Sequence, residues 1–209
     1  MTNIPPGPEQ VAFFATGGLA GLSVLPIELY STLAAQTRPA SLLPFLRSHA
    51  LIQVPRAGFR FWTFDIARNQ LNAIQPSRRS QLRTTLTGGL SGFCGGLAEV
   101  TYQSLAFQRR LPALSALANQ SCKLFFCFGT YTGLSTRLSE ELPPRPFWRF
   151  WLMGSVAGGV GSGIVGAVEG ARGRTLLRAT GKGALSIGTV IAVQVTSCAQ
   201  VLRPRSLDS

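Results

Sequence analysis

Three glutamates stand at matching places in apolar stretches of this 209-residue chain. Glu28, Glu99 and Glu169 each follow a Gly-Gly pair after nine intervening residues, and the acids lie 71 and then 70 residues apart. A fixed period of this kind indicates one structural unit repeated three times. A carboxylate inside an apolar segment is costly unless a base or a polar solute accompanies it. The spacing therefore indicates charge pairing or the handling of a charged solute.

The elements that must hold these acids are apolar segments, each longer than the roughly 20 residues that a bilayer core requires. Gly, Ser, Thr and single charges interrupt all of them, as in helices that pack together with their polar groups inward. We expect an all-α membrane protein whose six transmembrane helices form three tandem two-helix repeats in a pseudo-threefold bundle. The expected spans are 10–36, 49–75, 82–108, 112–138, 146–177 and 181–203. The expected division is a Pro-rich extension at 1–9, repeats at 10–76, 77–142 and 143–203, and a tail at 204–209.

A row of small residues marks one face of the fifth span. Small residues at every fourth position allow a second helix backbone to approach closely, so helix packing explains the row without any transport function. The row consists of Gly154, Gly158, Ser162, Gly166 and Gly170.

The composition suits a membrane protein better than a soluble nucleic-acid-binding protein. Hydrophobic residues make up 45% of the chain, charged residues 13%, and the net charge is +12. The basic residues are scattered between apolar runs, as in a membrane protein whose loops contact anionic lipid headgroups. Their pattern matches no nucleic-acid-binding motif. His49 is the only histidine and the four cysteines form no C-x-x-C pair, so we expect no metal site. With no nucleophile–base pair and no phosphate loop, we expect no catalytic residue and no enzyme.

Two motifs accompany the acids. The pattern P-x-[DE]-x-x-[KR]-x-[KR] is matched in part by Pro26, Glu28, Glu99, Glu169, Arg172 and Arg174. The pattern [FY]-[DE]-x-x-[KR] is matched on the second span by Phe64, Asp65 and Arg68. These motifs resemble those on the odd and even helices of the mitochondrial carrier family, and the resemblance covers nearly the whole chain. It implies a multi-pass protein of the mitochondrial inner membrane, a matrix-side charge network at the odd-helix motif, and no cofactor beyond a bound phospholipid such as cardiolipin.

The sequence departs from that family at the residues that form its gates. Ser31 and Tyr102 replace two of the three bases that would pair with the acids, and on the even helices only Asp65 and Arg68 are kept. A carrier alternates between two states by forming and breaking both sets of pairs. Neither gate can therefore close by the usual pairing of the family.

Arg56, Arg60 and Lys123 are the bases left within the expected spans. One interpretation places them with the three glutamates around a substrate cavity. The other is a static buried network, or neutral carboxyl groups, kept from ancestry, since burial alone favours the uncharged form. The missing gate bases favour the static network.

We therefore expect a non-transporting structural subunit of a large inner-membrane complex, such as the respiratory chain or ATP synthase. Its partners would be membrane lipids and other subunits of that complex. The alternative is a divergent transporter that exchanges a small anionic metabolite across the inner membrane. A third interpretation is a relative of the glycine-rich inner-membrane protein translocases, although these have four spans and no threefold repeat.

Overall fold

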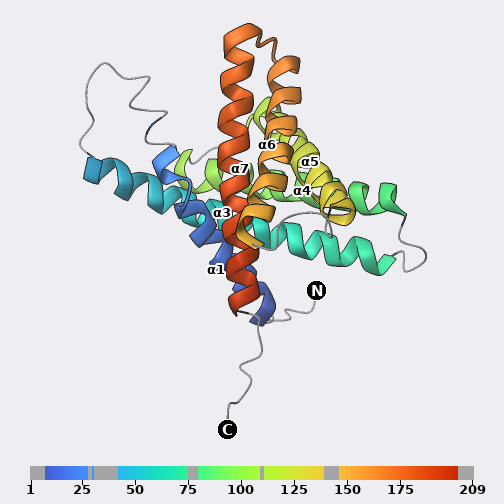
Figure 1. Ribbon diagram of the computed structural model, residues 1–209. Coiled ribbons are helices and arrows are strands. Elements are labelled where there is room, and N and C mark those ends of the chain that lie inside the picture. The colour runs from blue at the N-terminus through green and yellow to red at the C-terminus, as the bar shows by residue number, and fades with distance from the viewer. Residues whose placement is uncertain are drawn as a thin grey trace.

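The computed structural model describes residues 8–27, 30, 42–74, 80–108, 111–138 and 146–201 (Figure 1). Within these residues every regular element is helical, which confirms the all-α class. The helices are α1 (Pro8–Leu22), α3 (Leu42–Ile74), α4 (Gln81–Gln103), α5 (Leu114–Arg137), α6 (Pro146–Val168) and α7 (Gly173–Val201), and a π-helical turn, η1 (Ser104–Gln108), extends α4.

The helices form three pairs joined into a closed ring. α1 packs on α3, α4 on α5, and α6 on α7, while α3 packs on α4, α5 on α6, and α7 returns to α1. Figure 1 shows α6 and α7 side by side, with α3 running across their direction. The order of the pairs along the chain is that of the three predicted repeats, but α3 does not stand parallel to α6 and α7.

Aromatic and aliphatic side chains from several helices of the ring form one buried core. Phe64 stacks on Phe128 with ring centroids 4.5 Å apart, and Phe61 meets the same ring edge-on at 5.9 Å. Leu124 and Ile191 complete the contact between α3, α5 and α7. The second, fourth and sixth predicted spans, which correspond to α3, α5 and α7, therefore share one apolar core.

The predicted small-residue row on α6 packs against α7 at four of its five positions. A Cβ atom on Gly158 would lie 2.6 Å from the Cβ of Ile187, and one on Gly166 would lie 3.2 Å from Cδ1 of Leu176. The first distance leaves no room for a side chain at Gly158, whereas the second is tight and would require the end of Leu176 to shift. The four positions are Gly154, Gly158, Ser162 and Gly166.

Gly170 does not belong to that packing row. It follows the end of α6, has a φ of 83°, and nothing lies within 4 Å of the position that its Cβ would take. Together with Gly173, at a φ of 54°, it forms the turn between α6 and α7. Positive φ favours glycine. This turn ends α6 at Val168, so the expected span 146–177 is too long.

The first predicted span is also interrupted. α1 ends at Leu22, and residues 25–27 are helical again after a turn at Ser23 and Val24. Pro26 has no amide hydrogen with which to continue the hydrogen-bond ladder of α1. The position equivalent to Pro26 in α4 is Leu97, and α4 continues through it without a break.

Two helices of the described chain are long and apolar enough to cross a membrane, namely Phe147–Val168 and Gly173–Cys198. A third apolar stretch, Val11–Ile27, is shorter. α3 and α5 carry Arg56, Arg60 and Lys123 along their length, which lowers their hydropathy. The other four expected spans stay predictions.

A basic cavity within the helix ring

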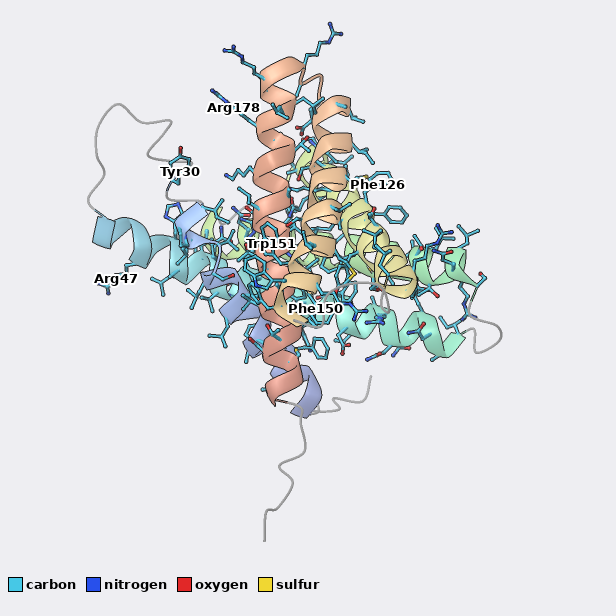
Figure 2. The ribbon with its side chains drawn as sticks, in the orientation of Figure 1. Tyr30, Arg47, Phe126, Phe150, Trp151 and Arg178 are labelled. Atoms are coloured by element: carbon cyan, nitrogen blue, oxygen red, sulfur yellow. The ribbon has the colours of Figure 1, made fainter. Side chains whose placement is uncertain are left out.

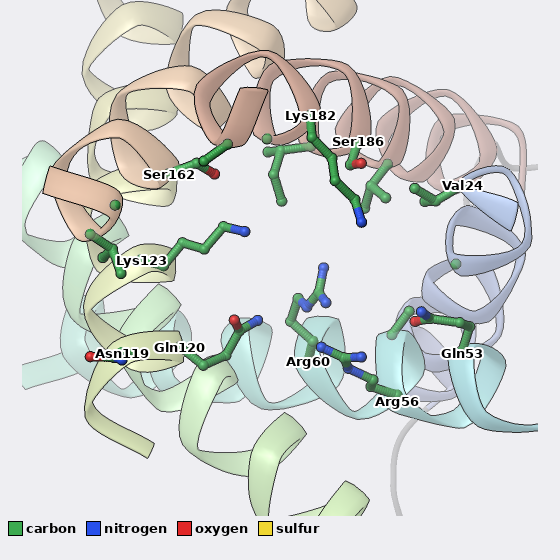
Figure 3. A pocket seen from close by; sticks show the side chains of 18 of the residues that line it. Val24, Gln53, Arg56, Arg60, Asn119, Gln120, Lys123, Ser162, Lys182 and Ser186 are labelled. Carbon is green, nitrogen blue, oxygen red and sulfur yellow. The ribbon is translucent and has the colours of Figure 1, made fainter. Parts of the chain in front are cut away.

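A cavity of about 460 Å³ opens among five of the six helices (Figure 3). Its wall is made by the end of the α1 segment and by α3, α5, α6 and α7. Ala116 and Lys182 are exposed, whereas Arg60 and Ser162 are buried. The cavity therefore has a solvent-facing mouth and a closed floor.

The second helix of each pair contributes lining residues in one common register. Each helix uses positions i, i+3, i+4 and i+7, which lie on one helix face. Corresponding members of the three sets are separated by 63 residues. The sets are Gln53, Arg56, Ala57 and Arg60 on α3, Ala116, Asn119, Gln120 and Lys123 on α5, and Ala179, Lys182, Gly183 and Ser186 on α7.

This register places bases at two of the four lining positions. The second position holds Arg56, Asn119 and Lys182, and the fourth holds Arg60, Lys123 and Ser186. Figure 3 shows the charged ends of the two arginines and two lysines directed into the cavity. Four cations from three helices thus face one hollow, with amide and hydroxyl groups between them.

One buried carboxylate supports the two arginines from behind. Glu99 of α4 is fully buried, and it is not among the lining residues. Arg60 donates its Nε–H to Oε2 of Glu99 at 2.5 Å, and Arg56 donates its Nε–H to Oε1. Because each arginine uses Nε for this contact, its terminal amino groups remain to face the cavity. The carboxylate also links α3 of the first pair to α4 of the second.

Comparison with known proteins identifies no relative. No protein-family model, curated protein or solved structure matches this chain. The cavity and its charges are the features that carry functional information.

The three predicted acids do not share one environment. Glu99 is buried in α4, whereas Glu169 is exposed in the turn after α6, where it accepts a hydrogen bond from Nδ2 of Asn119 at 2.5 Å. Glu28 lies outside the described residues. Arg172 and Arg174 are exposed, in that turn and in the first turn of α7, so the odd-helix motif does not continue along α6. Among the described residues, the matrix-side network expected from the carrier resemblance is reduced to Glu99 and its two arginines.

The residues of the even-helix motif also separate. Phe64 is part of the apolar core, and Asp65 accepts a hydrogen bond from Nδ2 of Asn69 at 3.2 Å. Arg68 is exposed. None of the three is among the residues that line the cavity. Arg56, Arg60 and Lys123, in contrast, all line it.

Several polar residues of the cavity were not identified from the sequence. Lys182, Asn119 and Gln120 belong to the 63-residue register, which a search for equal spacing on the second helices would have found. The buried hydroxyl oxygen atoms of Ser162 and Ser186 have no hydrogen-bond partner within the described residues. Buried hydroxyl groups are normally paired, so these two are exceptions within the wall of the cavity.

Proposed function

We propose that this chain is a carrier-like helical membrane protein whose central cavity binds a small anionic solute. The observation that carries the proposal is the convergence of Arg56, Arg60, Lys123 and Lys182 on one cavity. The cavity volume of about 460 Å³ falls within the usual range for small-molecule sites. Buried positive charge attracts a counter-charge, and guanidinium groups suit carboxylates and phosphates in particular.

The proposed setting is the mitochondrial inner membrane, with six helices spanning it in a pseudo-threefold arrangement. Support comes from the carrier resemblance, from the closed ring of three helix pairs, and from the apolarity of α6 and α7. Charged side chains within a membrane protein usually face a cavity or one another, as Arg56, Arg60 and Lys123 do. The cavity itself supports only binding of an anion. The carrier resemblance is the reason to propose that the anion is also exchanged across the membrane.

Ligand binding by the full-length chain in detergent tests this proposal. Inorganic phosphate, succinate and tricarballylate should raise the midpoint of thermal unfolding in a saturable way, whereas glucose should not. Lys123→Gln should weaken the apparent affinity by about tenfold, because a charge-assisted hydrogen bond is lost.

The matched control is Arg178→Gln, which removes the same charge from an exposed position. Figure 2 shows Arg178 extending outward from α7, and it does not line the cavity. Its affinity should stay within about twofold of wild type, since exposed charges act weakly. Equal losses in both variants, or the absence of saturable binding, would contradict the proposal.

The competing proposal is the structural accessory subunit of a respiratory or ATP-synthase complex. It is favoured by apolar side chains that remain exposed on the outer faces of α4 and α6, namely Leu82, Leu86, Leu90, Val156 and Val160. Such faces are covered by lipid or by another protein. A mild-detergent native gel of mitochondrial membranes separates the two proposals. Stoichiometric comigration with a large complex would support the accessory subunit, and migration at monomer size would support the solute-binding protein.

A further inference from the structure

We propose that the α6–α7 hairpin binds phospholipid in two ways, through an apolar surface that contacts lipid chains and a basic end that holds anionic headgroups. The inference rests on the membrane setting of the proposed function, and it is independent of any solute in the cavity. It commits to one partner, a bilayer leaflet that contains anionic phospholipid.

The first observation is a row of large apolar side chains on α6, here called the outer stripe. Its members recur at every fourth residue, and all are exposed, from 36% at Ile164 to 81% at Val168. Residues four apart are neighbours on a helix surface, so the row is continuous. Its two ends are 20 positions apart. That is a rise of about 30 Å, which matches the hydrocarbon core of a bilayer. The outer stripe consists of Trp148, Leu152, Val156, Val160, Ile164 and Val168.

The chemistry of the outer stripe favours lipid over another protein helix. Helices that pack together in a membrane meet at small residues, and α6 already uses its row of small residues against α7. A further position faces α5, since a Cβ on Gly161 would overlap Sγ of Cys127. The outer stripe contains no small residue, and its one polar group is the indole N–H of Trp148. Large aliphatic side chains of this kind suit contact with lipid hydrocarbon.

Aromatic side chains mark the first end of the outer stripe. Phe147 and Trp148 are exposed, and their rings meet edge-on with centroids 5.8 Å apart. Trp148 meets Trp151 in the same manner at 5.9 Å. Tryptophan is enriched where hydrocarbon gives way to headgroups, because its ring is apolar and its N–H is polar. The start of α6 is therefore suited to one surface of the bilayer.

Arginines mark the second end, and residues 169–178 are here called the arginine end. Arg172 lies in the turn after α6, and Arg174 and Arg178 follow in the first two turns of α7. All three are exposed, as is Leu177 at 73%. Arg174 and Arg178 are neighbours on the helix surface, and Figure 2 shows Arg178 extending outward. Guanidinium groups suit phosphate because their planar N–H donors can bind two oxygen atoms at once.

Charge complementarity favours an anionic headgroup at the arginine end. The sequence holds no Asp or Glu between Glu169 and Asp208. The carboxylate of Glu169 accepts a hydrogen bond from Nδ2 of Asn119, and Glu169 lines the cavity. Arginines near an anionic leaflet strengthen binding to it. Because Glu169 and Lys182 both line the cavity near this end of the hairpin, the cavity opens toward the same leaflet.

Photo-crosslinking of the full-length chain in phospholipid vesicles tests both surfaces. The probes are phosphatidylglycerol with a diazirine on the acyl chain or on the headgroup, and matched phosphatidylcholine probes provide the comparison without net charge. Mass spectrometry of peptides should place acyl labels on the outer stripe and headgroup labels on the arginine end. At equal probe concentration, the arginine end should carry about tenfold more label from phosphatidylglycerol.

Two pairs of substitutions test the arginines. Arg174→Gln with Arg178→Gln should lower the preference for phosphatidylglycerol to about twofold or less, because two charges are lost. Arg174→Lys with Arg178→Lys keeps both charges, so the preference should stay within about threefold of wild type. The control is Arg68→Gln with Arg137→Gln, which removes the same charge from exposed positions outside the hairpin. It should leave the preference within about twofold of wild type.

The outcomes separate this inference from the proposed function. Equal labelling of the arginine end by both headgroups, or an unchanged preference in the Gln pair, would overturn the headgroup site and leave the membrane setting and solute binding in place. Acyl labels on other helices but none on the outer stripe would overturn the lipid-facing surface, as expected if a protein subunit covers it. An absence of acyl labels from the whole chain would overturn the membrane setting on which both proposals rest.

Discussion

Arg60 belongs both to the buried ion pair with Glu99 and to the wall of the cavity. Its Nε–H is bound to Glu99, while its position on α3 makes it the fourth member of the lining set. Only 8% of the residue is exposed, so its charge must be compensated within the protein. The carboxylate of Glu99 provides that compensation on the protein side. Removal of this carboxylate leaves buried charge without a counter-charge.

Glu99→Gln should accordingly destabilise the protein. The substitution breaks a buried pair and leaves two guanidinium groups around a neutral amide, so we expect the free energy of unfolding to fall by about 3–5 kcal/mol. Thermal or denaturant unfolding in detergent measures this loss. Asp65→Asn is the control, and its half-buried carboxylate should contribute about 1 kcal/mol or less. An unchanged unfolding midpoint for Glu99→Gln would mean that the carboxylate does not join α3 to α4.

The charged residues of this cluster could be found in the sequence, but their pairing could not. Glu99, Arg56, Arg60 and Lys123 are conspicuous because each interrupts an apolar run. Which base meets which acid depends on how each helix is rotated about its axis and on which helices are neighbours. The carrier motif suggested pairing between odd helices. The structure instead pairs the acid of α4 with two bases of α3.

The contact between α6 and α7 depends on residues without side chains. Gly158 approaches Ile187 so closely that an added methyl group would have to displace it. Overpacking of this kind costs about 1–3 kcal/mol. The spacing of the small residues predicted close packing on another helix, since small residues at every fourth position let a second backbone approach. The spacing did not predict that α6 ends at Val168. The sequence alone does not distinguish a glycine that packs against another helix from one, such as Gly170, that forms a turn.

Gly158→Ala should lower the unfolding free energy by about 1–3 kcal/mol through this overlap. Gly181→Ala is a matched control on α7, since nothing lies within 4 Å of the position that its Cβ would take. At that position alanine should be neutral or stabilise the helix by up to about 1 kcal/mol. Thermal unfolding of the two variants measures the difference. Equal effects would show that the glycine row is not the site of contact.

The ring as a whole is closed where the first helix meets the last. Nε2 of Gln194 on α7 donates to Oγ1 of Thr16 on α1 at 3.0 Å, and Sγ of Cys198 lies 3.0 Å from the same oxygen. The sequence predicted six helical segments and their order by repetition, because apolar runs and glycine pairs are local features. Closure could not be predicted in this way, since it depends on the sum of all the crossing angles between the helices.

A cross-link provides a direct test of closure. Thr16→Cys places a second thiol next to Cys198, and mild oxidation should join the two helices by a disulfide. The product should migrate faster on a non-reducing denaturing gel and lose two hydrogen masses. The double variant Thr16→Cys with Cys198→Ser should show neither change. An open arrangement of α1 and α7 would give no cross-link under conditions that oxidise other close thiol pairs.

The seam between α1 and α7 also decides when the cavity can first be complete during synthesis of the chain. Thr16 and Cys198 are separated by 182 positions in the chain. At a synthesis rate of about 5–20 residues per second, the ribosome needs roughly 10–40 s to make the stretch between them. During that interval the nascent α1 has no α7 to cover it, and the cavity lacks the wall that carries Lys182 and Ser186. Nascent chains that end before α7 therefore contain at most five of the six described helices, an uncovered seam and an incomplete cavity, so the ring cannot close until the last helix has been made.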